Sequence, residues 1–324
     1  VAVVNGCTDA TASNYNPNAT ADDGSCIQAI TQDNIHSAVD LWESDQAAAE
    51  ATYGHISDWD VSGVTSMLRL FQHHTTFNDD ISNWDVSNVT TMQEMFMKAH
   101  LFNQDLSSWD LSNVTNTQFM FYDANVFNQD ISSWNVSNVT VMWGMFLNAH
   151  AFNQNLSAWD VSSVTNIVGM FHTASAFNGD ISSWDISNVT NLQDMFRNCT
   201  NFDQDISGWD VSNVTNMKWI FDNASSFNQD ISSWNVSNVT EWGSAFTGVN
   251  SLSNENKCSI NSSFSSNSNW PYDWSGLCPV YGCTDATAFN YNADATADDG
   301  SCVAIVAGCT DATASNYNPN ATAD

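Results

Sequence analysis

Hydrophobic residues recur every 25 positions through the middle of this chain, from about Ile56 to Asn250, without an insertion or a deletion. Two aromatic columns carry the period: Trp59, Trp84, Trp109, Trp134, Trp159, Trp184, Trp209 and Trp234, and Phe71, Phe96, Phe121, Phe146, Phe171, Phe196, Phe221 and Phe246. A period of this length indicates one supersecondary unit per repeat, which cannot bury its apolar face alone and stacks on its neighbours. The pattern predicts a repeat solenoid of eight coils with the Trp, Phe and Met columns in its core.

Within one repeat, the pattern changes from alternating to helical. The first half alternates apolar and polar residues, as in a short strand with one buried face: Ile81, Trp84, Val86 and Val89. The second half has the i, i+3, i+4, i+7 spacing of a short helix: Met92, Met95, Phe96 and Ala99. Thr90 and Gln93 have the spacing of a capping box at its start. Each coil is expected to hold one short strand and one short helix.

The repeat words resemble a known family. Residues 89–114 read VTTMQEMFMKAHLFNQDLSSWDLSNV, and the words VTxM, MF, FNQDIS and WDVSNVT return at the same offsets in nearly every coil. These words resemble the BspA-like leucine-rich repeat surface proteins over about residues 56–250, and residues 33–55 resemble the helical leader of such repeats. The resemblance implies a leucine-rich-repeat-like solenoid in a secreted or surface-exposed protein, with a role in adhesion or extracellular structure.

The two ends of the chain carry copies of one motif. Residues 6–22 (GCTDATASNYNPNATAD) recur identically as residues 308–324, and residues 282–302 are a close relative. The motif resembles a short cysteine module common in large secreted proteins. Cys7 and Cys309 are 302 positions apart, and Cys309 is expected to pair with a cysteine four positions beyond Asp324. We expect either one period of a longer tandem polypeptide or a subunit completed by the next copy, and both favour a filament.

Six of the eight cysteines fall into short-range pairs, predicted as Cys7–Cys26, Cys258–Cys278 and Cys283–Cys302. Loops of about 20 residues suit disulfides that close small segments without a core, each contributing about 3 kcal/mol. Disulfides indicate an oxidising compartment, hence an extracellular or cell-surface protein. Cys199 is expected to be a buried small hydrophobe. No run of 18 apolar residues exists, so no membrane span is predicted.

These patterns divide the chain into six parts. They are a disulfide-bonded, Asx-rich module (1–28), a helical N-terminal cap (29–55), the eight-coil solenoid (56–250), a disulfide-closed C-terminal cap (251–281), a second module (282–302) and the truncated start of a third (303–324).

Charge excludes several partners. Five basic residues stand against 36 acidic ones, for a net charge of −31. Such a chain repels nucleic acid and anionic membranes, so neither is expected as a partner. Cations and cationic surfaces fit better, although the acidity also has a simpler explanation in solubility.

The modules are the best candidates for a metal site. Their oxygen-bearing side chains crowd into a closed loop, as a hard cation such as Ca²⁺ requires: Asp9, Asn14, Asn16, Asn18, Asp22 and Asp23, and Asp285, Asn290, Asn292, Asp294, Asp298 and Asp299. The spacing is not that of an EF-hand. The alternative is a disulfide-bonded loop whose Asx side chains serve turns.

Polar residues form columns on the predicted solenoid. Two aspartate columns, beginning at Asp60 and Asp80, are expected either to cap turns or to be bridged by cations. An asparagine column beginning at Asn78 is expected to satisfy backbone groups at a turn. Six asparagines begin N-V-T sequons and Asn18 begins N-A-T, so that seven are named as candidate glycosylation sites, although the regular repeat word also explains them: Asn18, Asn88, Asn113, Asn138, Asn188, Asn213 and Asn238.

Nothing in the sequence pairs a nucleophile with a base, so no enzymatic activity is predicted. The favoured function is a structural one, as a tandem or end-to-end unit of a surface filament that contacts copies of itself. The alternative is an adhesin that binds a surface glycan or protein through the solenoid face, which requires an exposed patch that breaks the repeat. The regularity of the coils favours the structural function. A weaker alternative is an ice- or mineral-binding face built on the threonine column that begins at Thr65.

Overall fold

The computed structural model describes residues 2–323, which form two compact units. The first unit holds residues 2–252 and 263–271, and the second holds residues 253–262 and 272–323. The predicted C-terminal cap (251–281) is therefore divided between them. Over residues 2–323, no helix has the length and the apolar composition needed to cross a membrane.

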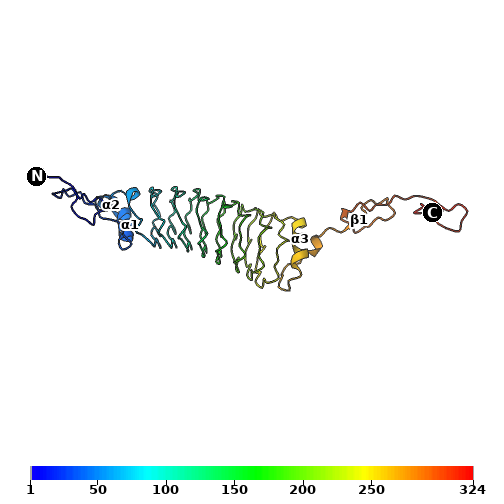
Figure 1. Ribbon diagram of the computed structural model, residues 1–324. Coiled ribbons are helices and arrows are strands. Elements are labelled where there is room, and N and C mark those ends of the chain that lie inside the picture. The colour runs from blue at the N-terminus through cyan, green and yellow to red at the C-terminus, as the bar shows by residue number, and fades with distance from the viewer. Residues whose placement is uncertain (1, 324) are drawn as a thin grey trace. The chain divides into compact units, whose positions relative to one another are not determined.

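Within the first unit, successive 25-residue repeats lie side by side as coils, and we call residues 56–250 the repeat stack (Figure 1). The Glu94 N–H donates to the carbonyl oxygen of Gln118 in the next coil at 2.8 Å, and the Met95 N–H bonds back to Met92 in its own coil at 3.2 Å. Single parallel bridges, such as Thr91 with Asn116, join neighbouring coils at a further position. Backbone polar groups are thus satisfied partly within each coil and partly between coils, as buried amides require.

The predicted strand and helix of each coil are both wrong. Residues 59–250 contain turns and single bridges in their place. Two positions in the coil adopt a left-handed backbone, as at Glu94 (φ 56°) and Lys98 (φ 61°), which interrupts any α-helix. The capping box is also wrong, because the N–H and hydroxyl of Thr90 both donate to the Thr65 carbonyl of the preceding coil, at 2.8 and 3.1 Å. A repeat protein with disulfide-bonded modules is confirmed, whereas coils of one strand and one helix are not found in residues 59–250.

The predicted core is confirmed, because the aromatic columns fill the interior of the repeat stack. The Phe121 ring lies 3.9 Å from that of Phe127 in its own coil, measured between ring centroids. It lies 5.4 Å from Phe96 and 5.6 Å from Phe146 in the coils on either side. In the tryptophan column, the seven indole N–H groups from Trp84 to Trp234 at 25-residue intervals each donate to a carbonyl oxygen 28 positions earlier, in the preceding coil. Stacked rings and indole hydrogen bonds therefore link every coil to its neighbours.

Aromatic residues from outside the repeat cover both ends of the stack. At the N-terminal end, α1 (Ile35–Ser44) and α2 (Gln46–Tyr53) precede the short helix η1 (Ile56–Asp58). The rings of Trp42 and Tyr53 meet Trp59 edge-on, at 6.1 and 5.9 Å. At the other end, Trp270 meets Trp242 of the last coil edge-on at 4.9 Å. The core is thereby shielded from water at each end, as repeat arrays require.

The second unit is built from short elements. It contains most of α3 (Asn254–Phe264), the short helix η2 (Ser275–Leu277), and the parallel pair β1 (Tyr281–Gly282) and β2 (Ala297–Asp298). A disulfide from Cys258 to Cys278 ties α3 to the residue after η2. With so little regular structure, this unit depends on its disulfides and turn hydrogen bonds.

Candidate functional site

The three cysteine modules share one hydrogen-bond framework. In each, an asparagine N–H donates to the carbonyl oxygen of the first cysteine at 2.9 Å: Asn16 to Cys7, Asn292 to Cys283, and Asn318 to Cys309. The module therefore keeps one local fold in every copy.

Three disulfides join the predicted pairs. Cys7–Cys26 and Cys283–Cys302 close the first two modules with Cα atoms 4.7 Å apart in each, and the third pair is the Cys258–Cys278 bond of the second unit. Cys309 has a free thiol, and its predicted partner lies outside the described residues.

The predicted calcium ligands lie on the module surface, where several of them cap turns. Asp9 Oδ1 accepts the hydroxyl and the N–H of Thr11 at 2.7 and 2.8 Å, and Asp23 Oδ1 accepts the Ser25 N–H at 3.0 Å. These hydrogen bonds favour the ionised form, so the threonine and serine partners hold the pKa of each carboxyl below its usual value. Each turn uses one carboxylate oxygen.

The remaining ligand candidates have similar roles. Asn14 and Asn290 cross their loops, each donating to a serine carbonyl and accepting a backbone N–H. Six others accept a backbone N–H from the residue two positions further on: Asn16, Asp22, Asp285, Asn292, Asp298 and Asp299. Asn18 and Asp294 are exposed at the turns that these side chains cap.

No group of three or more His, Cys, Asp or Glu side chains is arranged to hold a metal ion in the described part of the chain. The turn-capping alternative accounts for the Asx hydrogen bonds, and calcium binding stays a prediction.

The sequon asparagines are exposed, and those of the repeat stack make one repeated hydrogen bond between coils. In the repeat stack, each Nδ2 donates to a serine carbonyl 26 positions earlier, as Asn113 does to Ser87 at 2.7 Å. The other five stack sequons make the same bond at 2.7 to 3.0 Å. The column beginning at Asn78 bridges coils too, since Asn78 Oδ1 accepts the Asn103 N–H at 2.8 Å. These asparagines therefore connect coils, and glycosylation stays a prediction.

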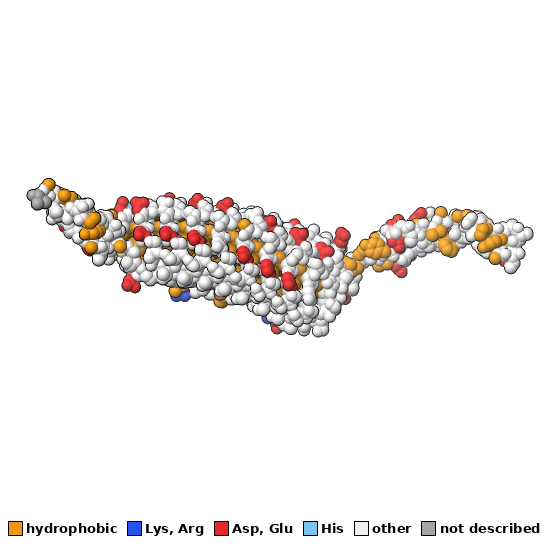
Figure 2. All heavy atoms as spheres, viewed as in Figure 1, with side chains coloured by type: hydrophobic (Ala, Val, Ile, Leu, Met, Phe, Trp, Pro, Cys, Tyr) orange, Lys and Arg blue, Asp and Glu red, His pale blue; other side chains and the backbone are white. Residues whose placement is uncertain are grey.

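The two aspartate columns run as parallel rows along the repeat stack (Figure 2). Asp80 accepts the Ser82 N–H at 2.9 Å, and Asp85 accepts the Ser87 N–H at 3.0 Å. Asparagine makes the same cap where it replaces aspartate, as Asn155 does to Ser157 at 2.8 Å. Turn capping thus accounts for both columns without a bridging cation.

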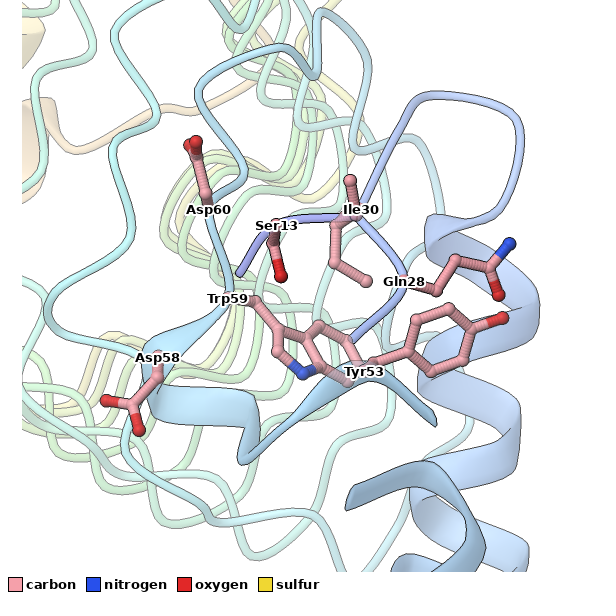
Figure 3. A pocket seen from close by; sticks show the side chains of 8 residues that line it. Ser13, Gln28, Ile30, Tyr53, Asp58, Trp59 and Asp60 are labelled. Atoms are coloured by element: carbon pink, nitrogen blue, oxygen red, sulfur yellow. The ribbon is translucent and has the colours of Figure 1, made fainter. Parts of the chain in front are cut away.

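A cleft of about 300 Å³ lies between the first module and the N-terminal helices, within the first unit (Figure 3). Tyr53, Trp59 and Ile30 supply its apolar lining, and Asp58 and Asp60 point away from each other. The end of the first module is held against α2 at this cleft, because the N–H of residue 28 donates to the Thr52 carbonyl at 2.8 Å. No motif in the sequence indicates this cleft, because it depends on how the module packs against α2.

Among the described residues, one hydroxyl contacts an imidazole: Ser57 Oγ lies 2.8 Å from His55 Nδ1, which also accepts the Ser57 N–H as the cap of η1. Burial raises the pKa of the Cys199 thiol far above its usual value, and the thiol donates to the Phe171 carbonyl. Burial also lowers the pKa of His172. His100 Nε2 lies 3.4 Å from Asp123 Oδ2. Cys199 is thus the buried small residue that the sequence predicts.

One surface departs from the regular repeat. We call it the variable face, defined by residues 68, 69, 72 and 73 and their equivalents 25 residues apart in every later coil. The column that begins at residue 72 holds a different amino acid in each of the eight coils: Gln72, Met97, Tyr122, Leu147, His172, Arg197, Asp222 and Thr247. The expectation of regularity across all coils is therefore wrong for this face. The signal for this face is present in the sequence as the columns whose residues change from coil to coil, whereas the repeat words report the core.

Comparison with known proteins gives one family. The family described as "Mycoplasma protein of unknown function, DUF285" matches residues 40–159 and again residues 142–259. The two matches together cover more than half of the chain, and neither reaches a cysteine module. No curated protein matches the chain.

Proposed function

The chain belongs to the DUF285 family, and from this premise we propose that it is a non-enzymatic, extracellular structural protein. In this proposal the repeat stack is a solenoid spacer, and the cysteine modules join one spacer to the next in a surface filament. Membership of a repeat family supports the spacer, and the three disulfides support an oxidising compartment.

The observation that carries the proposal is the return of one module, with one framework, on both sides of the stack in the sequence. The Val4 N–H donates to the Thr20 hydroxyl at 3.0 Å, and the Val306 N–H donates to the Thr322 hydroxyl at 2.8 Å. A module whose local fold does not depend on its neighbours suits a joint that is used repeatedly.

The covered ends of the stack support the same division of roles. Trp42 and Tyr53 at one end, and Trp270 at the other, cover the outermost aromatic residues. Direct stacking of one spacer core on another would require these caps to leave. Joining therefore falls to the modules.

Electron microscopy tests the proposal. Native surface material is labelled with an antibody against the repeat stack, and the purified chain is imaged beside it. We expect labelled fibres with a regular repeat that corresponds to one 302-residue unit. Label confined to isolated particles, with a purified chain that stays monomeric at high concentration, would contradict the filament.

Calcium at the joints is a separate proposal. Turn capping accounts for one oxygen of Asp9 and Asp23, which leaves a second carboxylate oxygen of each to meet a cation. Calorimetric titration of the full chain with CaCl₂ is expected to give heat that Asp22→Asn with Asp23→Asn reduces. An unchanged titration curve in that variant would remove the first module as a site, and the same result with Asp298→Asn and Asp299→Asn would remove the second.

The two alternative functions, an adhesin and an ice- or mineral-binding protein, each require a particular surface. An adhesin needs a surface whose residues differ from coil to coil, whereas a spacer does not. An ice- or mineral-binding face needs free threonine hydroxyl groups, but the Thr115 hydroxyl donates to the Thr90 carbonyl at 3.2 Å. That hydrogen bond recurs along the column and favours a structural role for threonine.

A further inference from the structure

Backbone strain marks the variable face. The column that begins at residue 69 has a left-handed backbone in every coil, with φ between 53° and 60°. Glycine occupies this column at Gly144 and Gly169, where it adopts φ 57° without a side-chain clash. Phe119 (φ 53°) and Trp219 (φ 55°) adopt the same backbone with bulky side chains. A left-handed backbone costs a residue with a side chain about 1–3 kcal/mol, so these two rings are kept at positions where glycine would avoid the cost.

These rings are available at the surface. Trp143 is 39% exposed, and its ring centroid lies 4.9 Å from that of Phe119, which lies 5.8 Å from Tyr122. The Trp219 ring forms a second platform, with Arg197 and Lys218 at 5.1 and 5.4 Å from its centroid.

Polar groups beside the rings are held in fixed positions. Glu94 accepts hydrogen bonds from Arg69, Gln72 and Gln93, each at 2.8 Å at its shortest. Four coils further on, Asp194 accepts from Arg197 and Gln193 at 3.3 and 3.0 Å. Glu94 is 7% exposed, so its role is to fix Arg69 and Gln72, and side chains fixed in this way lose little conformational freedom when a ligand binds.

Charge on this face is balanced, unlike the rest of the chain. The variable face carries four of the five basic residues, and they equal its four acidic residues in number. The chain as a whole carries a net charge of −31. In Figure 2 the Lys and Arg atoms in view lie along the lower edge of the stack, apart from the aspartate rows. A balanced face on an acidic protein favours an uncharged ligand over a polyanion or a polycation.

We propose that the variable face binds a neutral glycan chain. A sugar ring has an apolar C–H face, which packs on an aromatic ring, and an edge of hydroxyl groups, which bond to fixed carboxylates, amides and guanidinium groups. A protein partner would instead need an apolar centre from which water is excluded, whereas Lys218, a residue type that is depleted at such centres, lies 5.4 Å from the Trp219 ring centroid. This activity is independent of the filament, because it uses the stack surface and not the modules.

Affinity electrophoresis of the full chain tests the proposal, in native gels that contain hydroxyethyl cellulose, mannan or laminarin, with anionic alginate as a comparison. We expect at least one neutral polymer to retard the chain. Trp143→Ala and Trp219→Ala, measured separately, are each expected to weaken retardation about tenfold, the loss of one aromatic contact. Leu101→Ala removes another exposed apolar side chain (52% exposed) outside the variable face, and it is expected to have no effect.

The melting temperature of each variant is also measured. If one tryptophan variant does not fold, the other still tests the proposal. The proposal is overturned if no neutral polymer retards the chain, if only alginate does, or if both folded tryptophan variants bind like the parent. If neutral polymers fail but a deglycosylated surface-protein extract binds in a way that requires Trp143, the face docks a protein and the glycan proposal is wrong.

Discussion

Truncation of one core ring tests how the repeat stack is held together. Phe121 is fully buried and contacts rings in its own coil and in both neighbouring coils. Phe121→Ala loses the transfer free energy of the ring and leaves a cavity between coils. Truncations of this kind cost about 3–5 kcal/mol, a large part of the roughly 5–15 kcal/mol that stabilises a folded domain.

Matched variants separate this packing effect from a general effect of truncation. Val126→Ala alters the same coil at a side chain that is 40% exposed, and it is expected to change the free energy of unfolding by less than about 0.5 kcal/mol. Phe246→Ala alters the last coil, where the ring is 7% exposed and has a repeat neighbour on one side only. Phe246→Ala is expected to lower the free energy of unfolding by more than Val126→Ala and by less than Phe121→Ala.

Urea unfolding of all three variants, followed by circular dichroism and tryptophan fluorescence, gives the comparison. In the Phe121→Ala protein the two probes are also expected to separate, because coils on either side lose their coupling and repeat arrays are held by neighbour contacts. A loss below about 1 kcal/mol, or one equal to that of Val126→Ala, would refute ring stacking as the main link between coils.

Three further predictions concern single side chains. In a Cys309→Ser background, a thiol reagent is expected to modify Cys199 only when urea unfolds the stack, because burial keeps this thiol protonated; labelling of the folded protein would contradict this. Hydrogen bonds from Ser162 lower the pKa of Asp160 in the folded protein below its ordinary value of 3.8. The ionised Asp160 therefore stabilises the fold fully above pH 3.8, and this stabilisation is lost as the pH falls through the lower pKa of the folded state. Asp160→Asn keeps the cap, as asparagine does in other coils, and is expected to reduce the acid sensitivity of the melting temperature; an unchanged pH profile would count against this role. Gly144→Ala is expected to lower the melting temperature because its Cβ would overlap the Phe119 ring, and adding Phe119→Ala is expected to restore part of the loss; no recovery would assign the effect to the backbone at φ 57°.

The sequence alone determined the number of coils, their register and their core. A tryptophan and a phenylalanine that recur at one interval must lie above one another, since any slip between coils would bury polar neighbours. Cysteine spacing and the copied motif likewise determined the three disulfides before any coordinates, because a module with no core has few other ways to close.

Tertiary structure decided the path of the backbone within each coil. The spacing of Met92, Met95 and Phe96 fits a helix and also fits a series of turns that face the same way. Left-handed residues at Glu94 and Lys98 favour the turns, since each is compensated by hydrogen bonds to the next coil that exist only once coils are stacked. The variable face also forms only once the coils are stacked. Rings 24 residues apart in sequence, such as Phe119 and Trp143, meet because stacking turns a sequence period into a distance of 4.9 Å between their centroids.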